Sequence, residues 1–333
     1  ILRKSCLITN VYWERPPGNK LETISDITKY ADRNDTIIKQ AKPKVIIACG
    51  EYALRYLTDE QGITKWRGSI LKTRFGCPCV PMIHPAAVLR NYSWKALCRH
   101  DAQKARLVAE EGMPKDLNRT ITTFATLPEF LLTDDKDEFV KEFELQIQAM
   151  SESPVISFDI ETFRNTITCI GIADSLSNAI VVPFTGQFNH QQSFKLIKSL
   201  DKCLRGDALK VGQNLDYDVQ YLAKRLGIGV KNVWMDTMVA HSVMHPEMGH
   251  SLDLLTSLYT LHPYYKEMRK EATSGHYNAT LWQYNGIDCC ITYEVAMKLW
   301  RELELTATKK FFTSISMPVT KTLVRMEHRG VLV

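Results

Sequence analysis

Two acidic side chains on one strand face are the first residues in this sequence that could do chemistry. In the stretch VISFDIET, residues 155–162, apolar and polar residues alternate, which is typical of a buried strand. The alternation places Asp159 and Glu161 on the same face, where paired carboxylates could bind a divalent cation. Taken alone, such a pair is more often solvated acidic surface than a metal site.

Two later stretches combine acidic and polar residues at helical spacing. In VGQNLDYDVQYLAKRLG the apolar residues recur with a helical period, and Asn214 and Asp218 lie four residues apart along its edge. In LWQYNGIDCCITYEVAMKLW a second helix places Tyr284 four residues before Asp288. Gly286 inside that helix costs about 1 kcal/mol relative to alanine. The sequence thus combines one strand with D-x-E and two helices with N-x-x-x-D and Y-x-x-x-D. This combination indicates a functional site far more specifically than any one of the three motifs does.

These motifs, taken in order, resemble those of the proofreading 3′-5′ exonuclease domain of family A DNA polymerases, in the tyrosine variant of the DEDD superfamily. The resemblance covers about residues 119–305, and WMDTM and HSLDLLTSLY resemble the segment between the second and third motifs. It implies a ribonuclease-H-like mixed sheet and single-stranded DNA 3′ ends as the substrate, with Asn214 among the substrate-binding residues. It also implies five catalytic residues, of which the four acids bind metal and the tyrosine orients the attacking water: Asp159, Glu161, Asp218, Tyr284 and Asp288.

Phosphodiester hydrolysis explains why such a site needs several acids. Two divalent ions about 3.5–4 Å apart can supply a nucleophile at neutral pH and stabilise charge on the attacking and leaving oxygens. Mg²⁺ or Mn²⁺ prefers oxygen ligands, which suits a carboxylate cluster without Cys or His. We expect Asp159 to bridge the ions. Glu161 and Asp288 then complete the nucleophile-side site, and Asp218 holds the second ion largely through water. Because the crowded acids repel one another, the site should be poorly formed in chelator.

Length and composition indicate how many domains the chain can form and which classes of protein it does not resemble. The chain has 333 residues, of which 45% are hydrophobic, so it can bury a sizeable core in two domains or so. No apolar run approaches membrane length, no signal peptide is visible, and nine scattered cysteines do not suggest a disulfide framework. We therefore expect no membrane partner and a cytoplasmic location. The resemblance to family A DNA polymerases implies that the cell is bacterial or phage-infected.

The charge is unevenly spread along the chain. Residues 1–120 contain 21 Lys and Arg against 12 Asp and Glu, a net +9, whereas residues 121–333 contain 21 against 25, a net −4. The basic half suits phosphate contacts, and the acidic half contains the expected cation site. Solvated surface is the alternative explanation of either imbalance, so the charge distribution supports nucleic-acid binding without establishing it.

The first 117 residues are expected to form an α/β domain with a parallel sheet. Strands over residues 6–11, 45–48 and 79–83 alternate with a helix that starts at residue 51 and one over residues 94–109. Ligands of such sheets gather at the carboxyl ends of the strands. Asn10, which could pair with a base edge, and His84, which could donate to an oxyanion, stand at two such ends. Taken singly, Asn10 is more often a turn former and His84 a loop histidine.

This segment resembles uracil-DNA glycosylases of the family 4 type over about residues 4–109. CLITNVYWERPPGNK, KPKVIIACGEYALRYL, ITKWRGSIL and IHPAAVLRNY match segments of that family in order. The resemblance implies uracil-containing DNA as a partner, with Asn10 reading the uracil edge and His84 stabilising the departing uracil anion. It also implies a loop that enters the minor groove, in which Leu89 fills the vacated base stack.

Three departures limit the glycosylase resemblance. The family's glycine-rich first motif, which positions the hydrolytic water, is not in the sequence. Glu14 stands where the family has an iron–sulfur cysteine, and no cysteine between Cys6 and Cys49 replaces the next ligand, so we expect no iron–sulfur cluster. We therefore rank a remnant or DNA-binding module above an active glycosylase.

The expected organisation is a glycosylase-like domain over residues 1–117, an exonuclease domain over 119–305 and the start of a family A polymerase domain over 306–333. MPVTKTLVRMEHRGVLV resembles the opening helix of that last domain, so we interpret the sequence as a fragment whose missing polymerase domain is a partner. Within the exonuclease segment, residues 169–173 and 179–183 should form strands that return alongside the acidic strand and give the antiparallel start of a ribonuclease-H-like sheet. Asp236 should cap a helix, and His241 and His245 should be partly solvated.

The predicted function is metal-dependent 3′-5′ exonuclease activity on single-stranded DNA. An RNA-trimming exonuclease of the same superfamily is a competing prediction, because the four acids do not distinguish sugars, although the polymerase-like tail favours DNA. A non-catalytic DNA-binding module is a further alternative, against which the four acids and Tyr284 argue. Uracil excision by the first domain is the runner-up activity.

Overall fold

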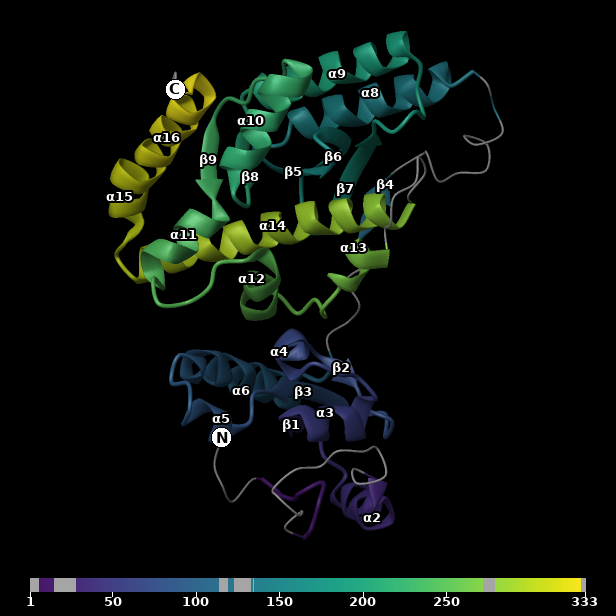
Figure 1. The fold of residues 1–333 in the computed structure, drawn as a ribbon, viewed down its shortest axis with the longest axis vertical. Helices are drawn as coiled ribbons and strands as arrows, with labels where there is room; N and C mark the ends of the chain where they lie inside the picture. The colour runs from purple at the N-terminus through teal and green to yellow at the C-terminus, as the bar shows by residue number, and fades with distance from the viewer. Residues whose placement is uncertain are drawn as a thin grey trace. The chain divides into compact units, whose positions relative to one another are not determined.

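The chain forms two compact units, each with its own sheet (Figure 1). The structure is a computed structural model, and it describes residues 6–14, 28–113, 119–122, 133, 135–271 and 279–330. The first unit consists of Ile1–Asp116 and Thr256–Tyr264, and the second of Leu117–Leu255 and Tyr265–Val333. Among the helices of these described ranges, none is both long and apolar enough to cross a membrane.

A three-stranded sheet with the order β1-β3-β2 lies at the centre of the first unit. β1 (Ile46–Cys49) pairs in parallel with β3 (Pro78–Met82), as the sequence predicts, and β2 (Leu71–Lys72) adds an antiparallel edge to β3. Within the described residues 28–113, the helices of this unit are α2 (Ala31–Ala41), α3 (Glu51–Thr58), α4 (Ile63–Trp66), α5 (Pro85–Val88) and α6 (Trp94–Glu111).

The predicted strand over residues 6–11 is wrong, because this segment has no strand in the structure. Leu7 and Ile8 are 64% and 65% exposed, so the apolar alternation there does not face a core. Side-chain contacts, and not pairing with a neighbouring strand, fix the position of this segment. Val11 packs against the cluster that contains Ala48, and its carbonyl accepts a 2.9 Å hydrogen bond from Asn34 Nδ2.

A buried ion pair stabilises the first unit. Arg67 Nε donates to Asp101 Oδ2 at 3.0 Å, and their side chains are 4% and 1% exposed. Arg67 Nη1 also donates to Ser257 Oγ at 2.8 Å, and Lys104 Nζ donates to the carbonyls of Ser257 and Thr260. These bonds fix Thr256–Tyr264 within the first unit.

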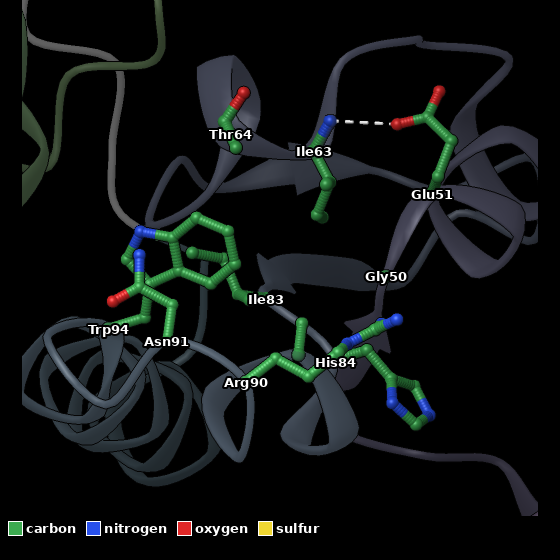
Figure 2. Close-up of a pocket in the computed structure, with 10 residues that line it drawn as sticks. Gly50, Glu51, Ile63, Thr64, Ile83, His84, Arg90, Asn91 and Trp94 are labelled. Carbon is green, nitrogen blue, oxygen red and sulfur yellow. Dashed lines mark hydrogen bonds between the residues drawn. The ribbon is translucent and has the colours of Figure 1, made fainter.

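A pocket of about 400 Å³ opens beside the carboxyl ends of β1 and β3 (Figure 2). Gly50 directly follows β1, and His84 follows β3 after one residue, so both loops contribute to the wall. Ile63, Ile83 and Trp94 give it apolar sides. The pocket therefore lies where parallel α/β sheets place their ligands.

A six-stranded mixed sheet with the order β4-β7-β6-β5-β8-β9 forms the second unit. Its strands are β4 (Thr120–Thr122), β5 (Val155–Phe163), β6 (Thr166–Ala173), β7 (Asn178–Pro183), β8 (Leu209–Gly212) and β9 (Val233–Asp236). β6 runs antiparallel to β5 and β7, whereas β5 pairs in parallel with β8, and β8 with β9. The predicted strands over residues 169–173 and 179–183 and the antiparallel start of the sheet are confirmed.

Helices cover both faces of this sheet (Figure 1). α8 (Asp137–Ser151), α9 (His190–Arg205) and α10 (Leu215–Leu226) lie on one face, and α14 (Ala279–Leu305) crosses the other. Ile156, Phe158 and Ile160 of β5 join the core under the first three helices, which leaves the other β5 face for α14. The remaining helical elements are α11 (Thr237–Met244), α12 (Leu252–Tyr259), α13 (Glu267–Glu271), α15 (Lys309–Phe311), the π-helix η4 (Phe312–Ser316) and α16 (Met317–Arg329).

Gly286 has a packing role in the middle of α14. A Cβ at this position would lie 2.4 Å from Cγ2 of Ile121 in β4, so a larger residue would require Ile121 or the helix to shift. The intrinsic cost of glycine in a helix is therefore offset by the close approach that it permits.

The prediction of a partly solvated His241 is wrong. His241 is fully buried on α11, and its Nδ1 lies 2.8 Å from Nδ1 of His250. His245 is partly exposed as predicted, with its Nε2 2.9 Å from Glu302 Oε1. The burial arises because α11 packs against α14, which a four-residue histidine spacing does not reveal.

Candidate active site

The pleat of β5 presents its polar residues to α14. Ser157 Oγ donates to the carbonyl of Cys289 at 2.7 Å, which fixes this strand against the helix. Asp159 and Glu161 follow on the same face, at alternate positions. The strand face predicted from sequence is therefore the face that meets the helix carrying Asp288.

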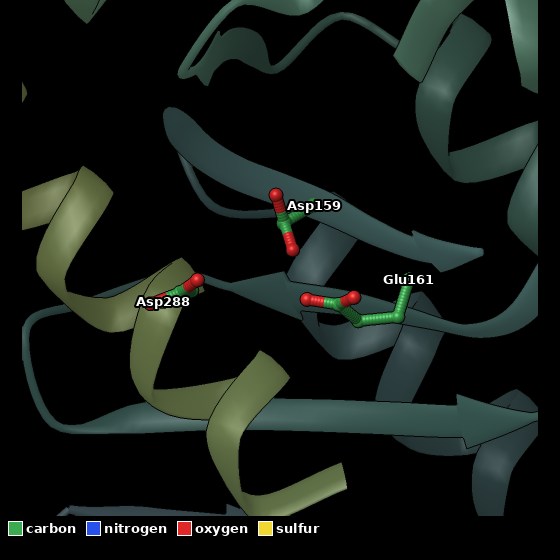
Figure 3. A group of neighbouring side chains, drawn as sticks. All are labelled: Asp159, Glu161 and Asp288. Carbon is green, nitrogen blue, oxygen red and sulfur yellow. The ribbon is translucent and has the colours of Figure 1, made fainter. Parts of the chain in front are cut away.

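Three carboxylates converge at this crossing. Asp159, Glu161 and Asp288 each offer an oxygen, and these oxygens all lie within 4.8 Å of one another (Figure 3). Glu161 and Asp288 are only 6% and 4% exposed. Burial, and then the neighbouring carboxylates, raise the pKa of Asp159 well above its usual value. Burial raises the pKa of Glu161 to about 7, against the opposing effect of Arg269.

This donor set fits a hard divalent metal. It offers carboxylate oxygens, which Mg²⁺ and Mn²⁺ prefer. The raised pKa values show that negative charge here is poorly compensated, and a bound cation removes that penalty. Divalent metal dependence is accordingly the chemistry that these residues support.

Asp218 lies beside the cluster without joining the three convergent oxygens. It is 4% exposed, and its Oδ1 accepts a 3.1 Å hydrogen bond from the backbone N–H of Ile160, between the two β5 acids. Burial raises its pKa well above the usual value. Asp218 is thus held against the strand that carries Asp159 and Glu161.

Asp236 fixes the start of α10, which carries Asp218. Its carboxylate accepts from the backbone N–H groups of Asn214 and Leu215, at 3.1 and 2.8 Å. The same carboxylate caps α11 by accepting from Met238, so the predicted cap is confirmed and has a second role. Asn214, predicted to bind substrate, is exposed at the N-cap of α10 with a φ of 58°.

Tyr284 and Asp288 lie one turn apart on α14, as predicted. Tyr284 is 2% exposed, and burial followed by the charge of Asp288 raises the pKa of its hydroxyl. Lys266 Nζ contacts both residues, at 2.6 Å from the Tyr284 hydroxyl and 2.9 Å from each Asp288 oxygen. Tyr265 OH also donates to Asp288 Oδ1.

Four residues at this site were missed by sequence reasoning: Tyr265, Lys266, Arg269 and Asn285. Asn285 Nδ2 donates to Asp159 Oδ2 at 2.7 Å, and Arg269 lies 3.4 Å from Glu161 Oε2. The only available signal was the pair of basic residues three apart in PYYKEMRK, a spacing that places both on one side of a helical turn.

In the first unit, the three residues carried over from the glycosylase resemblance are not all in the pocket. His84 lines it and caps α5, with Nδ1 accepting from the Ala86 N–H at 3.1 Å. Asn10 is exposed and is not among the lining residues. Leu89, at the end of α5, is 87% exposed. Glu14 pairs with Lys29 at 2.9 Å.

Known proteins match both parts of the chain. A 3′-5′ exonuclease family model matches residues 135–304, just over half of the chain, and a uracil DNA glycosylase superfamily model matches residues 1–108. The DNA polymerase of Bacillus phage SP01 is 24% identical over an alignment of 363 residues, which covers 95% of this chain and 37% of that polymerase. DNA polymerase I of Synechocystis sp. is 35% identical over 159 residues, which is 45% of this chain and 16% of that protein.

The glycosylase segment has its own relative. The type-4 uracil-DNA glycosylase of Sulfurisphaera tokodaii is 30% identical over 115 residues, covering 32% of this chain and 52% of that enzyme. Both predicted resemblances are confirmed, and the chain spans well under half the length of either polymerase. The chain belongs to the 3′-5′ exonuclease family found in DNA polymerase I-like proteins, and it carries a uracil DNA glycosylase superfamily segment ahead of the exonuclease.

Proposed function

We propose that the second unit removes nucleotides from the 3′ ends of single-stranded DNA as the proofreading part of a DNA polymerase. The observation that carries this proposal is the convergence of Asp159, Glu161 and Asp288, with Tyr284 one turn from Asp288. The burial of Glu161 and Asp288 and a purely carboxylate donor set suit hydrolysis of a phosphodiester at a metal site.

Two Mg²⁺ or Mn²⁺ ions are the proposed cofactors. Asp159, Glu161 and Asp288 would hold one ion, and Asp218, largely through water, would hold the other together with Asp159. When bound, the ions supply a nucleophile at neutral pH and stabilise charge on the leaving oxygen.

The chain's own residues then orient the reactants. The raised pKa of Tyr284 keeps its hydroxyl protonated at neutral pH, so this group can hold a water by hydrogen bonding. Asn285 fixes one oxygen of Asp159, and the Ile160 N–H fixes one oxygen of Asp218. Asn214, exposed at the start of α10, is the proposed contact to the substrate strand.

The proposed partner of the exonuclease is a polymerase domain that follows α16. Val319, Leu323 and Met326 of α16 are 52%, 49% and 61% exposed, which leaves an apolar helix face for such a domain to cover. The phage and bacterial polymerase relatives support this arrangement, in which residues 306–333 begin the polymerase domain. They also support the proposal of a cytoplasmic location.

The test is a nuclease assay on a 5′-labelled single-stranded DNA that carries one internal uracil, with Mg²⁺ or Mn²⁺ present. We expect a ladder that shortens from the 3′ end and disappears in chelator and in Asp159→Ala. Asp216→Ala is the matched control, because this acid lies two residues from Asp218 but accepts a hydrogen bond from Gln220. An RNA of the same sequence distinguishes the RNA-trimming alternative, and absence of any ladder would contradict the proposal.

Uracil excision by the first unit is a second candidate function. The observation that favours it is His84, whose Nδ1 is an acceptor and whose Nε2 therefore carries the proton that an oxyanion needs. Asn10 as the reader of the uracil edge and Leu89 as the wedge are parts of this proposal. Alkali-sensitive cleavage only at the uracil, unaffected by chelator and lost in His84→Ala, would support it. DNA binding without either product would leave a non-catalytic module.

A further inference from the structure

Two basic residues, Lys266 just before α13 and Arg269 within it, offset part of the negative charge of the acidic cluster. Lys266 Nζ lies 2.9 Å from both oxygens of Asp288, and Arg269 Nη2 lies 3.4 Å from Glu161 Oε2. Their spacing of three residues places both on one side of the same turn. Each of the two therefore contacts a different member of the proposed metal-binding set.

Lys266 is the more firmly held of the two. Its side chain is 20% exposed, and its ammonium also lies 2.6 Å from the Tyr284 hydroxyl and 4.7 Å from the centre of that ring. Arg269 is 61% exposed, so solvent screens its ion pair. Lys266 is thus the cation that contacts both Asp288 oxygens, which a metal ion would otherwise bind.

We propose that Lys266 is a tethered counter-ion that a divalent metal must displace from Asp288, so that this residue sets the metal concentration at which the exonuclease site fills. The inference rests on the proposed metal-dependent function. A carboxylate whose two oxygens both contact an ammonium binds a second cation less well, because the ammonium and the metal ion would repel each other at these short distances.

The balance of charges favours displacement of Lys266 by the metal ions over binding of both at the same carboxylates. Two divalent ions match the four carboxylates charge for charge, so Lys266 in place would leave an excess of positive charge beside buried carboxylates. The lysine side chain has four flexible methylene groups, and Lys266 stands at a turn immediately before α13, which allows its ammonium to move.

The test is direct titration of Mn²⁺ binding at pH 8, by the electron paramagnetic resonance signal of the free ion, on the whole chain. We expect Lys266→Gln to bind Mn²⁺ at least about fivefold more tightly, because a unit positive charge on the metal's own ligand is removed. Arg269→Gln should give a smaller gain, and Lys266→Arg, which keeps the charge, should stay within about twofold of the parent. Lys298→Gln removes a charge from the far part of α14, where Lys298 pairs with Glu294, and should change nothing.

Unchanged or weaker Mn²⁺ binding in a folded Lys266→Gln variant would overturn the proposal and make Lys266 a purely structural partner of Asp288. Thermal unfolding reports whether the variant is folded. If it is not, Lys266→Met keeps the aliphatic stem beside Tyr265 and Tyr284 and replaces it in the titration. Because the readout is metal binding, loss of the nuclease ladder in the parent protein would contradict the proposed function without deciding this inference.

Discussion

Gly171→Ala tests whether the approach of α14 to β6 sets the geometry of the acids. Gly171 stands directly opposite Asp159 in the β5–β6 pair. A Cβ at this position would lie 2.3 Å from Asn285 Oδ1 and 2.7 Å from Cys289 Sγ, both on α14. Asn285 and Cys289 are fully buried, so the methyl group must displace the helix or the Asn285 amide that holds Asp159.

The expected magnitude follows from overpacking and from the lost hydrogen bond. An extra methyl group in a well-packed core costs about 1–3 kcal/mol, which lowers the melting temperature of a unit of this size by about 2–4 °C per kcal/mol. Displacing a residue that orients a metal ligand typically lowers activity by about 10–100-fold. We therefore expect at least about a tenfold loss of exonuclease rate in Gly171→Ala.

The assay combines thermal unfolding with the rate of 3′ shortening. Gly249→Ala is the matched control, because its Cβ would meet only Leu254 Cδ2 at an ordinary 3.4 Å. Adding Asn285→Ala to Gly171→Ala removes the closest clash and should restore part of the stability, because the 2.7 Å approach to Cys289 Sγ remains. Activity should stay low, because Asp159 has lost its amide donor. A Gly171→Ala variant that melts and digests like the parent would refute the reasoning.

Three further predictions concern charge. The pKa of Glu161 is raised from 4.5 to about 7, so the folded chain holds this proton more tightly than the unfolded one. In chelator, denaturant titrations should therefore show stability falling by up to about 3 kcal/mol as the pH rises from about 4.5 to about 7. Mn²⁺ affinity should rise over the same window, and a flat profile would contradict both statements. Asp288→Asn should abolish tight Mn²⁺ binding, whereas Asp218→Asn should leave one ion bound, and equal losses in the two variants would contradict the assigned roles. Arg67→Met or Asp101→Leu alone should lower the free energy of unfolding by about 3–5 kcal/mol, as measured by thermal unfolding. The double variant should recover most of that loss, because only the single variants bury an unpaired charge.

The parts of the site that sequence could predict depend on local periodicity. Alternation in residues 155–162 indicated the face of Asp159, and helical spacing placed Tyr284 one turn from Asp288, because both patterns follow from backbone geometry alone. The same reasoning failed for residues 6–11, since alternation does not say whether a neighbouring strand exists to pair with. Lys266 could not be placed either, because its contacts depend on how the segment before α13 returns to α14.

The closeness of α14 to the sheet links these observations. Gly286 lets the helix lie against β4, and Gly171 lets it lie against β6, at two positions where any Cβ would collide with a facing side chain. A helix held at that distance brings Asp288 to the carboxylates of β5, and Asn285 within 2.7 Å of Asp159. Because the mutual repulsion of the acids acts to separate helix and strand, packing at the two glycines and the ammonium of Lys266 must together oppose it. A divalent ion that replaces this ammonium would then bind to acids whose backbone positions are already set by the glycine contacts.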